Sequence, residues 1–197
     1  MDTDRLLAMT DGVVAIIITI MVLELKVPEG ASWEALAHAW PVFVAYALSF
    51  VYVAIYWNNH HHYFHLVCKV DGPIMWANFN LLFWLSLVPF ATGWMGEHAF
   101  APVPVAVYGI ALFMPALAWR AMQSVIICSQ GADSPMKQYV GRDAKGTVSP
   151  VLYAAGIGLS FVAPWAGLLC YAAVAVLWLM PDRRIEAMVA DDSAKAP

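Results

Sequence analysis

The sequence predicts an all-α membrane protein with six transmembrane helices per subunit, and three observations support this: the composition, the apolar runs and the placement of basic residues. Of its 197 residues, 62% are hydrophobic and only 12% are charged. The mean hydropathy is +0.68. Soluble domains contain about 45–50% apolar and about 25% charged residues. The surplus of apolar side chains predicts a surface that faces lipid.

Six apolar runs are candidate membrane spans, because a helix needs about 20 mostly apolar residues, within a range of about 17–25, to cross a bilayer. The runs cover residues 6–25, 36–57, 74–95, 103–127, 148–162 and 166–180. Pro28 and Gly30 end the first run, since both disfavour helix. A polar stretch rich in Gly, Ser, Asp and Lys, residues 129–147, follows the fourth run and predicts a loop. The last two runs are short, are joined by a turn at residues 163–165, and predict a helical hairpin.

The basic residues predict the orientation, because cytoplasmic loops carry an excess of Lys and Arg. With the N-terminus in the cytoplasm, nine of the ten basic residues fall on the inner side and only Lys26 falls outside. This predicts a multi-pass protein of the cell membrane with both termini cytoplasmic. We expect one membrane domain over residues 1–182 and a polar cytoplasmic tail over residues 183–197.

Several function classes are disfavoured by composition and spacing. A net charge of −4 without a basic patch argues against nucleic acid as a partner. The three cysteines form no CxxC pair, so neither a disulfide framework nor a cysteine metal site is expected. Glu97 and His98 are adjacent, but no nucleophile motif accompanies them, so we expect no enzyme and no cofactor.

The first run contains one hydroxyl in a long apolar stretch. At about 100° per residue, one stripe of the helix holds Gly12, Ile16, Thr19, Leu23 and Val27, with Ile20 at its edge. The other faces are equally apolar, so the pattern does not choose which face is special. The pattern alone favours a plain membrane helix, in which the Thr19 hydroxyl bonds back to the carbonyl of Ala15.

Polar side chains collect at the cytoplasmic ends of the first three runs. Burying the charged side chain of Asp11 in a membrane costs free energy unless the carboxylate is paired or hydrated. Arg5 lies about 120° away around the helix, so the partner of Asp11 is expected on another helix. The second run ends in Asn and His residues, and the third begins with Trp76 and Asn78. We therefore expect a buried network of Asp11 with histidine and asparagine.

The histidines of residues 60–65 leave three interpretations open. His61 and His65 have the i,i+4 spacing that suits a metal on a helix. A metal site would still need a third ligand at similar reach. A pH-sensing role is a third interpretation, because histidine titrates near neutral pH. We favour a structural role in the network, and we predict no metal site.

Taken together, these segments resemble the lysosomal and prokaryotic potassium channels of the transmembrane protein 175 type. That family carries Arg-x-x-x-Phe-Ser-Asp on its first helix, and this chain reads RLLAMTDGVVAIIITIMVLELKVP from Arg5, with Met9 and Thr10 in place of Phe and Ser. The stretch YWNNHHHYF, residues 56–64, is similar to the family's Trp-x-x-His-His stretch. Residues 75–97 and 179–188 are similar to its third helix and C-terminal end.

The resemblance implies a homotetramer of six-helix subunits with a central pore lined by the first helix. It places the constriction at Ile16, a threonine layer at Thr19 and further apolar rings at Ile20 and Leu23. It also implies a motif and interhelical network, comprising Arg5, Thr10, Asp11, His60, His61, Trp76 and Asn78.

The function that this implies is passive conduction of K⁺ across the membrane, with other copies of the chain and membrane lipids as partners. The alternative is a proton- or cation-coupled secondary transporter that uses the histidine cluster and Asp11. Transporter sites usually lie near the bilayer midplane on broken helices. No charged residue is expected at that depth here, which favours the channel.

Overall fold

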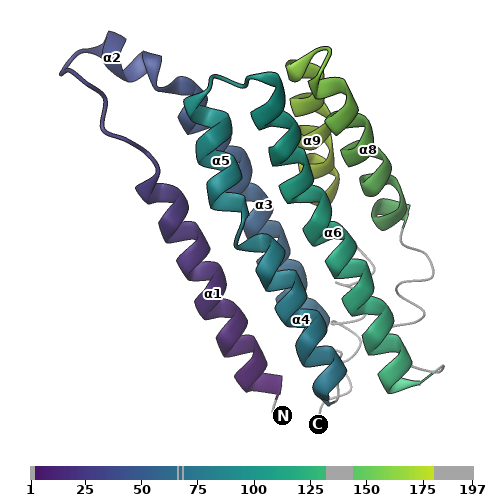
Figure 1. Cartoon of the computed structure of the whole chain (residues 1–197). Helices are drawn as coiled ribbons and strands as arrows, with labels where there is room; N and C mark the ends of the chain where they lie inside the picture. The colour runs from purple at the N-terminus through teal and green to yellow at the C-terminus, as the bar shows by residue number, and fades with distance from the viewer. Residues whose placement is uncertain (1–2, 66, 68, 132–143, 180–197) are drawn as a thin grey trace.

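The computed structural model describes residues 3–65, 67, 69–131 and 144–179, and all of the regular structure in these ranges is helical. Helices occur in each of the six predicted segments, and they are arranged as a tall bundle (Figure 1). The predicted tail, residues 183–197, and most of the predicted loop lie outside the described residues. Within the described ranges, four segments are long and apolar enough to cross a membrane: Thr3–Leu23, Trp40–Phe64, Gly72–Glu97 and Pro102–Gln130.

The first two segments are joined by a short outer helix. Helix α1 covers Thr3–Leu23 and α3 covers Trp40–Phe64, while the six-residue α2, Trp33–His38, lies between them. Ser32 caps α2 by accepting a hydrogen bond from the backbone N–H of Ala35 at 3.1 Å. Helix α3 continues to Phe64, beyond the predicted end at residue 57, so the histidine run forms its last turns.

The third segment is two helices and not the single helix that the sequence predicts. Helix α4 covers Gly72–Leu85 and begins at an Asp71 cap, whose carboxylate accepts from the N–H of Ile74 at 3.0 Å. Helix α5 covers Val88–Glu97. Pro89 lacks the N–H that a continuous helix would give to the carbonyl of Leu85. This missing bond explains why the helix breaks where it does.

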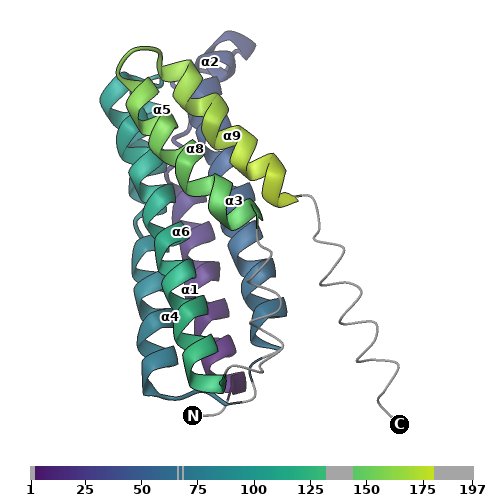
Figure 2. The ribbon, with the colours of Figure 1, turned by 90° about the vertical axis from the view of Figure 1, so that its right-hand side faces the viewer.

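The remaining helices are α6, Pro102–Gln130, α8, Ala144–Ser160, and α9, Pro164–Leu179. Helices α8 and α9 form the expected hairpin and pack against α6. With 17 and 16 residues they are shorter than the other segments, and they stop partway along α6 and α3 (Figure 2).

The core has two parts, stacked along the bundle. One part is built by α1, α4 and the C-terminal halves of α3 and α6, around residues such as Ile17, Ile74 and Met122. The other is built by α5, α8, α9 and the N-terminal halves of α3 and α6, around Tyr108 and Tyr171. Helix α1 belongs to only one of these parts and lies at the edge of the bundle (Figure 1).

Helices α6 and α9 approach closely at Gly109, which yields a first prediction. A Cβ at Gly109 would lie 2.0 Å from the hydroxyl oxygen and 2.5 Å from Cζ of Tyr171. Tyr171 is completely buried and has no room to move aside. Overpacking of this kind costs about 1–3 kcal/mol, so Gly109→Ala should lower the thermal unfolding temperature in detergent. Gly158→Ala is the matched control, because its Cβ would meet nothing within 4 Å, and it should leave the unfolding temperature unchanged or slightly raised.

Candidate pore-lining helix

One face of α1 packs against the rest of the subunit. Its buried residues recur at helical spacing: Leu6, Thr10, Val14, Ile17 and Met21. They contact α3, α4 and α5, which are the helices that neighbour α1. The Ile17 side chain is 2% exposed and the Met21 side chain is 1% exposed. This face fixes the rotation of α1 within the subunit.

The opposite face of α1 is left uncovered by the subunit's own helices. Ile16 is 58% exposed, Ile20 is 42% exposed and Leu23 is 79% exposed. Gly12 and Thr19 are exposed as well. These are the residues on the stripe that the sequence pattern could not single out. The structure therefore separates two faces of α1 that are chemically alike, and the residues assigned to the pore by family resemblance all lie on the free one.

The hydroxyl of Thr19 is anchored to the backbone of its own helix. The Thr19 O–H group donates a hydrogen bond to the carbonyl of Ile16 at 2.8 Å. The expected acceptor was the carbonyl of Ala15, one residue earlier. The bond to Ile16 uses the only hydrogen of the hydroxyl. The oxygen lone pairs stay available as acceptors, and they lie on the exposed face of α1.

A buried chain of hydrogen bonds links the packed face of α1 to two other helices. The Asn78 side chain on α4 donates to the Thr10 hydroxyl at 3.0 Å and also lies 2.8 Å from Nε2 of His60 on α3. All three residues are at most 3% exposed. Because Asn78 offers its oxygen and its nitrogen to different partners, each buried polar group is satisfied. The predicted contact between asparagine and histidine is present, and Thr10 joins it.

Asp11 has a different partner from the one expected. Its carboxylate accepts a hydrogen bond from the indole N–H of Trp57 at 2.8 Å, and both residues are exposed. Asp11 lies on the exposed side of α1, next to the buried Thr10, and among the described residues its carboxylate makes no hydrogen bond to His60 or Asn78. Sequence reasoning missed Trp57, although an indole N–H on a helix facing α1 is a donor that a carboxylate can use. Arg5 is exposed, and no hydrogen bond or ion pair to it is found within the described ranges.

The other predicted network residues lie outside the buried chain. His61 is exposed, stacks on Trp57 with ring centroids 6.1 Å apart, and lies 3.1 Å from His65 between their Nε2 atoms. Among the described residues, no group of three or more His, Cys, Asp or Glu side chains is placed to hold a metal ion. Trp76 is 70% exposed, and its ring lies beside that of Phe79, with the ring centroids 5.8 Å apart.

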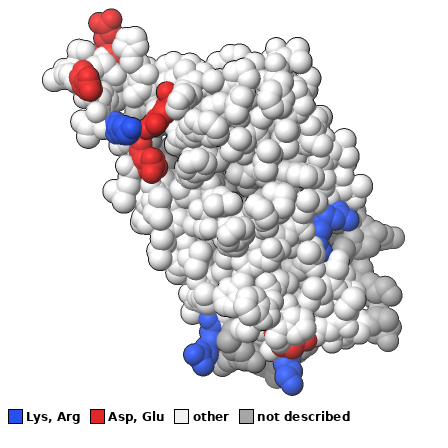
Figure 3. All heavy atoms as spheres, viewed as in Figure 1, with Lys and Arg blue, Asp and Glu red and all other residues white. Residues whose placement is uncertain are grey.

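The outer end of α1 is tied to α5 by charge. Lys26, just after α1, forms an ion pair with Glu97 at the end of α5, and this hydrogen bond raises the pKa of Lys26 above its usual value. Acidic side chains gather around this pair at one end of the molecule (Figure 3). They are Glu24, Glu29, Glu34 and Glu97. At the opposite end, Ser129 of α6 donates to Asp71 before α4, and this bond lowers the pKa of Asp71.

Comparisons with known proteins agree on one kind of relative. Residues 5–89 match the family described as endosomal/lysosomal potassium channel TMEM175. A potassium channel of Chryseobacterium sp. strain P1-3 is 53% identical over 186 residues, which cover 94% of this chain and 97% of the relative. A potassium channel of Streptomyces collinus is 36% identical over 129 residues, covering 61% and 63% of the two chains.

A solved structure is also similar over most of the chain. It is the crystal structure of a lysosomal potassium-selective channel TMEM175 homolog from Chamaesiphon minutus. The TM-score is 0.80 and the sequence identity is 28%, with 90% of this chain and 96% of the other covered. The similarity therefore extends beyond residues 5–89 to most of the chain.

Proposed function

The chain belongs to the TMEM175 potassium channel family, and from this premise we propose that it conducts K⁺ passively through a pore lined by the exposed face of α1. The observation that carries the proposal is the exposure of Ile16, Ile20 and Leu23 on a single face. An apolar face is stable in lipid too, but the hydroxyl oxygen of Thr19 on the same face favours contact with ions or water.

One subunit with one lining helix cannot enclose a pore, so symmetry must supply the other walls. Four copies arranged around an axis bring four α1 helices together with their exposed faces inward. We assign residues 1–182 to this six-helix channel domain. The distribution of basic residues supports a cell-membrane protein with both termini in the cytoplasm and the acidic end of Figure 3 outside.

The four Ile16 side chains form the narrow neck of this pore. A narrow apolar ring closes by expelling water, because an ion does not enter a dry neck. When the ring widens slightly, a partly hydrated ion passes. K⁺ sheds water more readily than the smaller Na⁺, so a tight neck favours K⁺. The lone pairs of four Thr19 oxygens, one turn away, replace part of the lost hydration.

The remaining polar residues hold the lining helix in register. The chain of Thr10, Asn78 and His60 fixes the packed face of α1. The bond from Trp57 to Asp11 fixes the side of α1 that turns toward α3. The ion pair of Lys26 with Glu97 fixes the outer end. Together these contacts keep Ile16 and Thr19 pointing at the axis.

Conduction is tested by reconstituting the protein in a planar bilayer with K⁺ on one side and Na⁺ on the other. We expect a current whose reversal potential follows the K⁺ gradient and does not move when a pH gradient is added. A reversal potential that follows the proton gradient would favour the coupled transporter instead, and a protein that carries no current in any gradient would contradict the proposal.

Assembly is tested separately by mass measurement of the protein in mild detergent. We expect the mass of four chains, each of 21.6 kDa, plus bound detergent. A monomer that still conducts would show that the pore is not built from four α1 helices.

A further inference from the structure

Arg120 is a charged side chain on the apolar helix α6, and it lies well before the end of that helix. Its guanidinium donates to the carbonyl of Gly146 in the first turn of α8, at 2.6 Å. Within the described ranges this is the one hydrogen bond found for Arg120, and the residue is exposed. A guanidinium carries five N–H donors, so most of them remain available to a further acceptor.

The depth of Arg120 follows from the length of α6. The helix has 29 residues, or about 43 Å, while the hydrocarbon layer of a bilayer is about 30 Å thick. Counted from Pro102, Arg120 lies about 27 Å along the helix. Helix α8 begins at this same level, as its bond to Arg120 shows. With Pro102 at one boundary of the hydrocarbon layer, Arg120 lies near the other boundary, next to the lipid headgroups.

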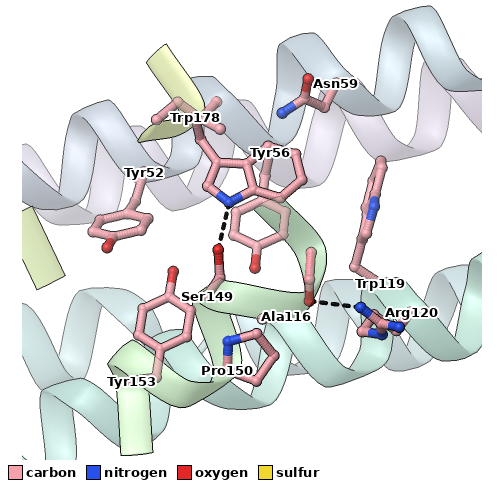
Figure 4. Close-up of a pocket in the computed structure, with 12 residues that line it drawn as sticks. Tyr52, Tyr56, Asn59, Ala116, Trp119, Arg120, Ser149, Pro150, Tyr153 and Trp178 are labelled. Carbon is pink, nitrogen blue, oxygen red and sulfur yellow. Dashed lines mark hydrogen bonds between the residues drawn. The ribbon is translucent and has the colours of Figure 1, made fainter. Parts of the chain in front are cut away.

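A pocket opens beside Arg120 between α3, α6, α8 and α9. Five of its twelve lining residues are aromatic, and Arg120 lies at the end away from Tyr52 and Tyr153 (Figure 4). The Ser149 hydroxyl accepts a hydrogen bond from the indole N–H of Trp178 at 2.9 Å and donates one to the carbonyl of Lys145 at 2.8 Å, so it is already engaged within the protein. The pocket is narrow, about 40 Å³, which is room for only a few water molecules.

We propose that Arg120 and this pocket bind an anionic phospholipid from the leaflet on the side where α6 ends. The phosphate accepts from the guanidinium in the two-pronged geometry that suits Arg, and the adjoining apolar part of the lipid enters the mouth of the pocket. Basic pockets between transmembrane helices bind anionic headgroups in this way. The pocket is too narrow for a whole acyl chain, so headgroup charge sets the preference.

Anionic lipid is favoured over zwitterionic lipid because the phosphate of phosphatidylcholine is already neutralised by its own ammonium group. An Arg at the headgroup boundary is stabilised by an anionic headgroup, and the described residues give Arg120 a carbonyl but no carboxylate. Lipid binding at Arg120 requires that the protein lies in a bilayer, but it does not require that α1 lines a pore. Lipid binding is also measured without any ionic current.

Native mass spectrometry in neutral detergent tests the site with phosphatidylglycerol and phosphatidylcholine of equal chain length. We expect the protein to prefer phosphatidylglycerol, and Arg120→Gln to reduce that preference about tenfold, as the loss of a charge-assisted hydrogen bond predicts. Gln keeps an N–H donor for the Gly146 carbonyl. Lys69→Gln is the matched control, since it removes one exposed basic charge outside the pocket, and it should leave the preference unchanged.

Three results would contradict the binding of an anionic phospholipid at Arg120. These are an undiminished preference in Arg120→Gln, an equal loss in Lys69→Gln, and displacement of phosphatidylglycerol by millimolar inorganic phosphate, which would indicate a site for free anions. If Arg120→Gln does not fold, brominated lipids give a second test. Brominated phosphatidylglycerol should quench Trp178 more than brominated phosphatidylcholine does, with Trp178 isolated as the difference between the wild type and Trp178→Phe. Equal quenching by the two lipids would contradict the proposal.

Discussion

Ile16→Asn is expected to raise the single-channel conductance several-fold and to lower the preference for K⁺ over Na⁺. The proposed neck is a ring of four Ile16 side chains, and its barrier depends on being narrow and dry. Asparagine is polar and wets the neck, so ions of both kinds enter with more of their hydration. The measurement is single-channel current together with reversal potential under a K⁺/Na⁺ gradient. Ile16→Leu keeps the volume and the apolar character, and it should change both quantities little.

Ile17→Asn is the matched control, because the same substitution falls on the opposite face. Ile17 is 2% exposed and packs in the core with α3 and α4. A buried amide without partners costs about 1–3 kcal/mol, so this variant should give less folded protein and no gain in conductance per channel. If Ile17→Asn opened the pore while Ile16→Asn did not, the assignment of the lining face would be wrong.

The sequence was sufficient to place the helical segments, because long apolar runs between Pro, Gly and polar stretches define them directly. Several helix ends differ from the predicted ends by a few residues, and α8 begins at Ala144, inside the stretch predicted to be a loop. Two further differences have a clear physical reason. The predicted helix of residues 74–95 is broken at residues 86 and 87, where Pro89 removes one backbone bond. The helix predicted to end at residue 57 continues to Phe64, because polar side chains can extend a helix beyond the apolar run that defines a span.

The choice of face on α1 could not be predicted from the pattern. Ile16 and Ile17 are neighbours of the same type, and only contacts with α3, α4 and α5 make one buried and the other exposed. Resemblance to a known family supplied Ile16, Thr19, Ile20 and Leu23, and the structure leaves all four exposed. Their role at a pore stays a prediction, to be settled by the conductance of Ile16 variants.

The partners of the polar residues were predictable only in part. Asn78 and His60 were expected together, since both are polar, lie at the same depth and need buried partners. Asp11 was expected with them but is bound by Trp57. Thr10 and Asp11 differ by one position and therefore by about 100° around α1. That rotation places the hydroxyl in the core and the carboxylate at the exposed edge.

Asn78→Leu is accordingly expected to destabilise the subunit more than Asp11→Ala does. Leucine fills the space but leaves Thr10 and His60, at 2% and 3% exposure, without their shared partner. A buried group left unsatisfied costs about 1–3 kcal/mol, whereas interhelical hydrogen bonds in membranes average only about 0.6 kcal/mol. Because two groups are orphaned together, we expect a loss above the membrane average, near the lower end of the first range. Asp11→Ala removes one exposed bond and should cost less.

Asn80→Leu is the control for this variant, because it makes the same change two residues further along α4 at an exposed position. Thermal unfolding in detergent, followed by the loss of the folded oligomer, measures all three variants. Asn78→Leu should unfold at the lowest temperature, and Asn80→Leu should match the wild type because its side chain leaves no buried partner behind. Equal unfolding temperatures for Asn78→Leu and Asn80→Leu would mean that the buried chain does not hold α1. The register of Ile16 and Thr19 would then depend on the contacts of Asp11 with Trp57 and of Lys26 with Glu97.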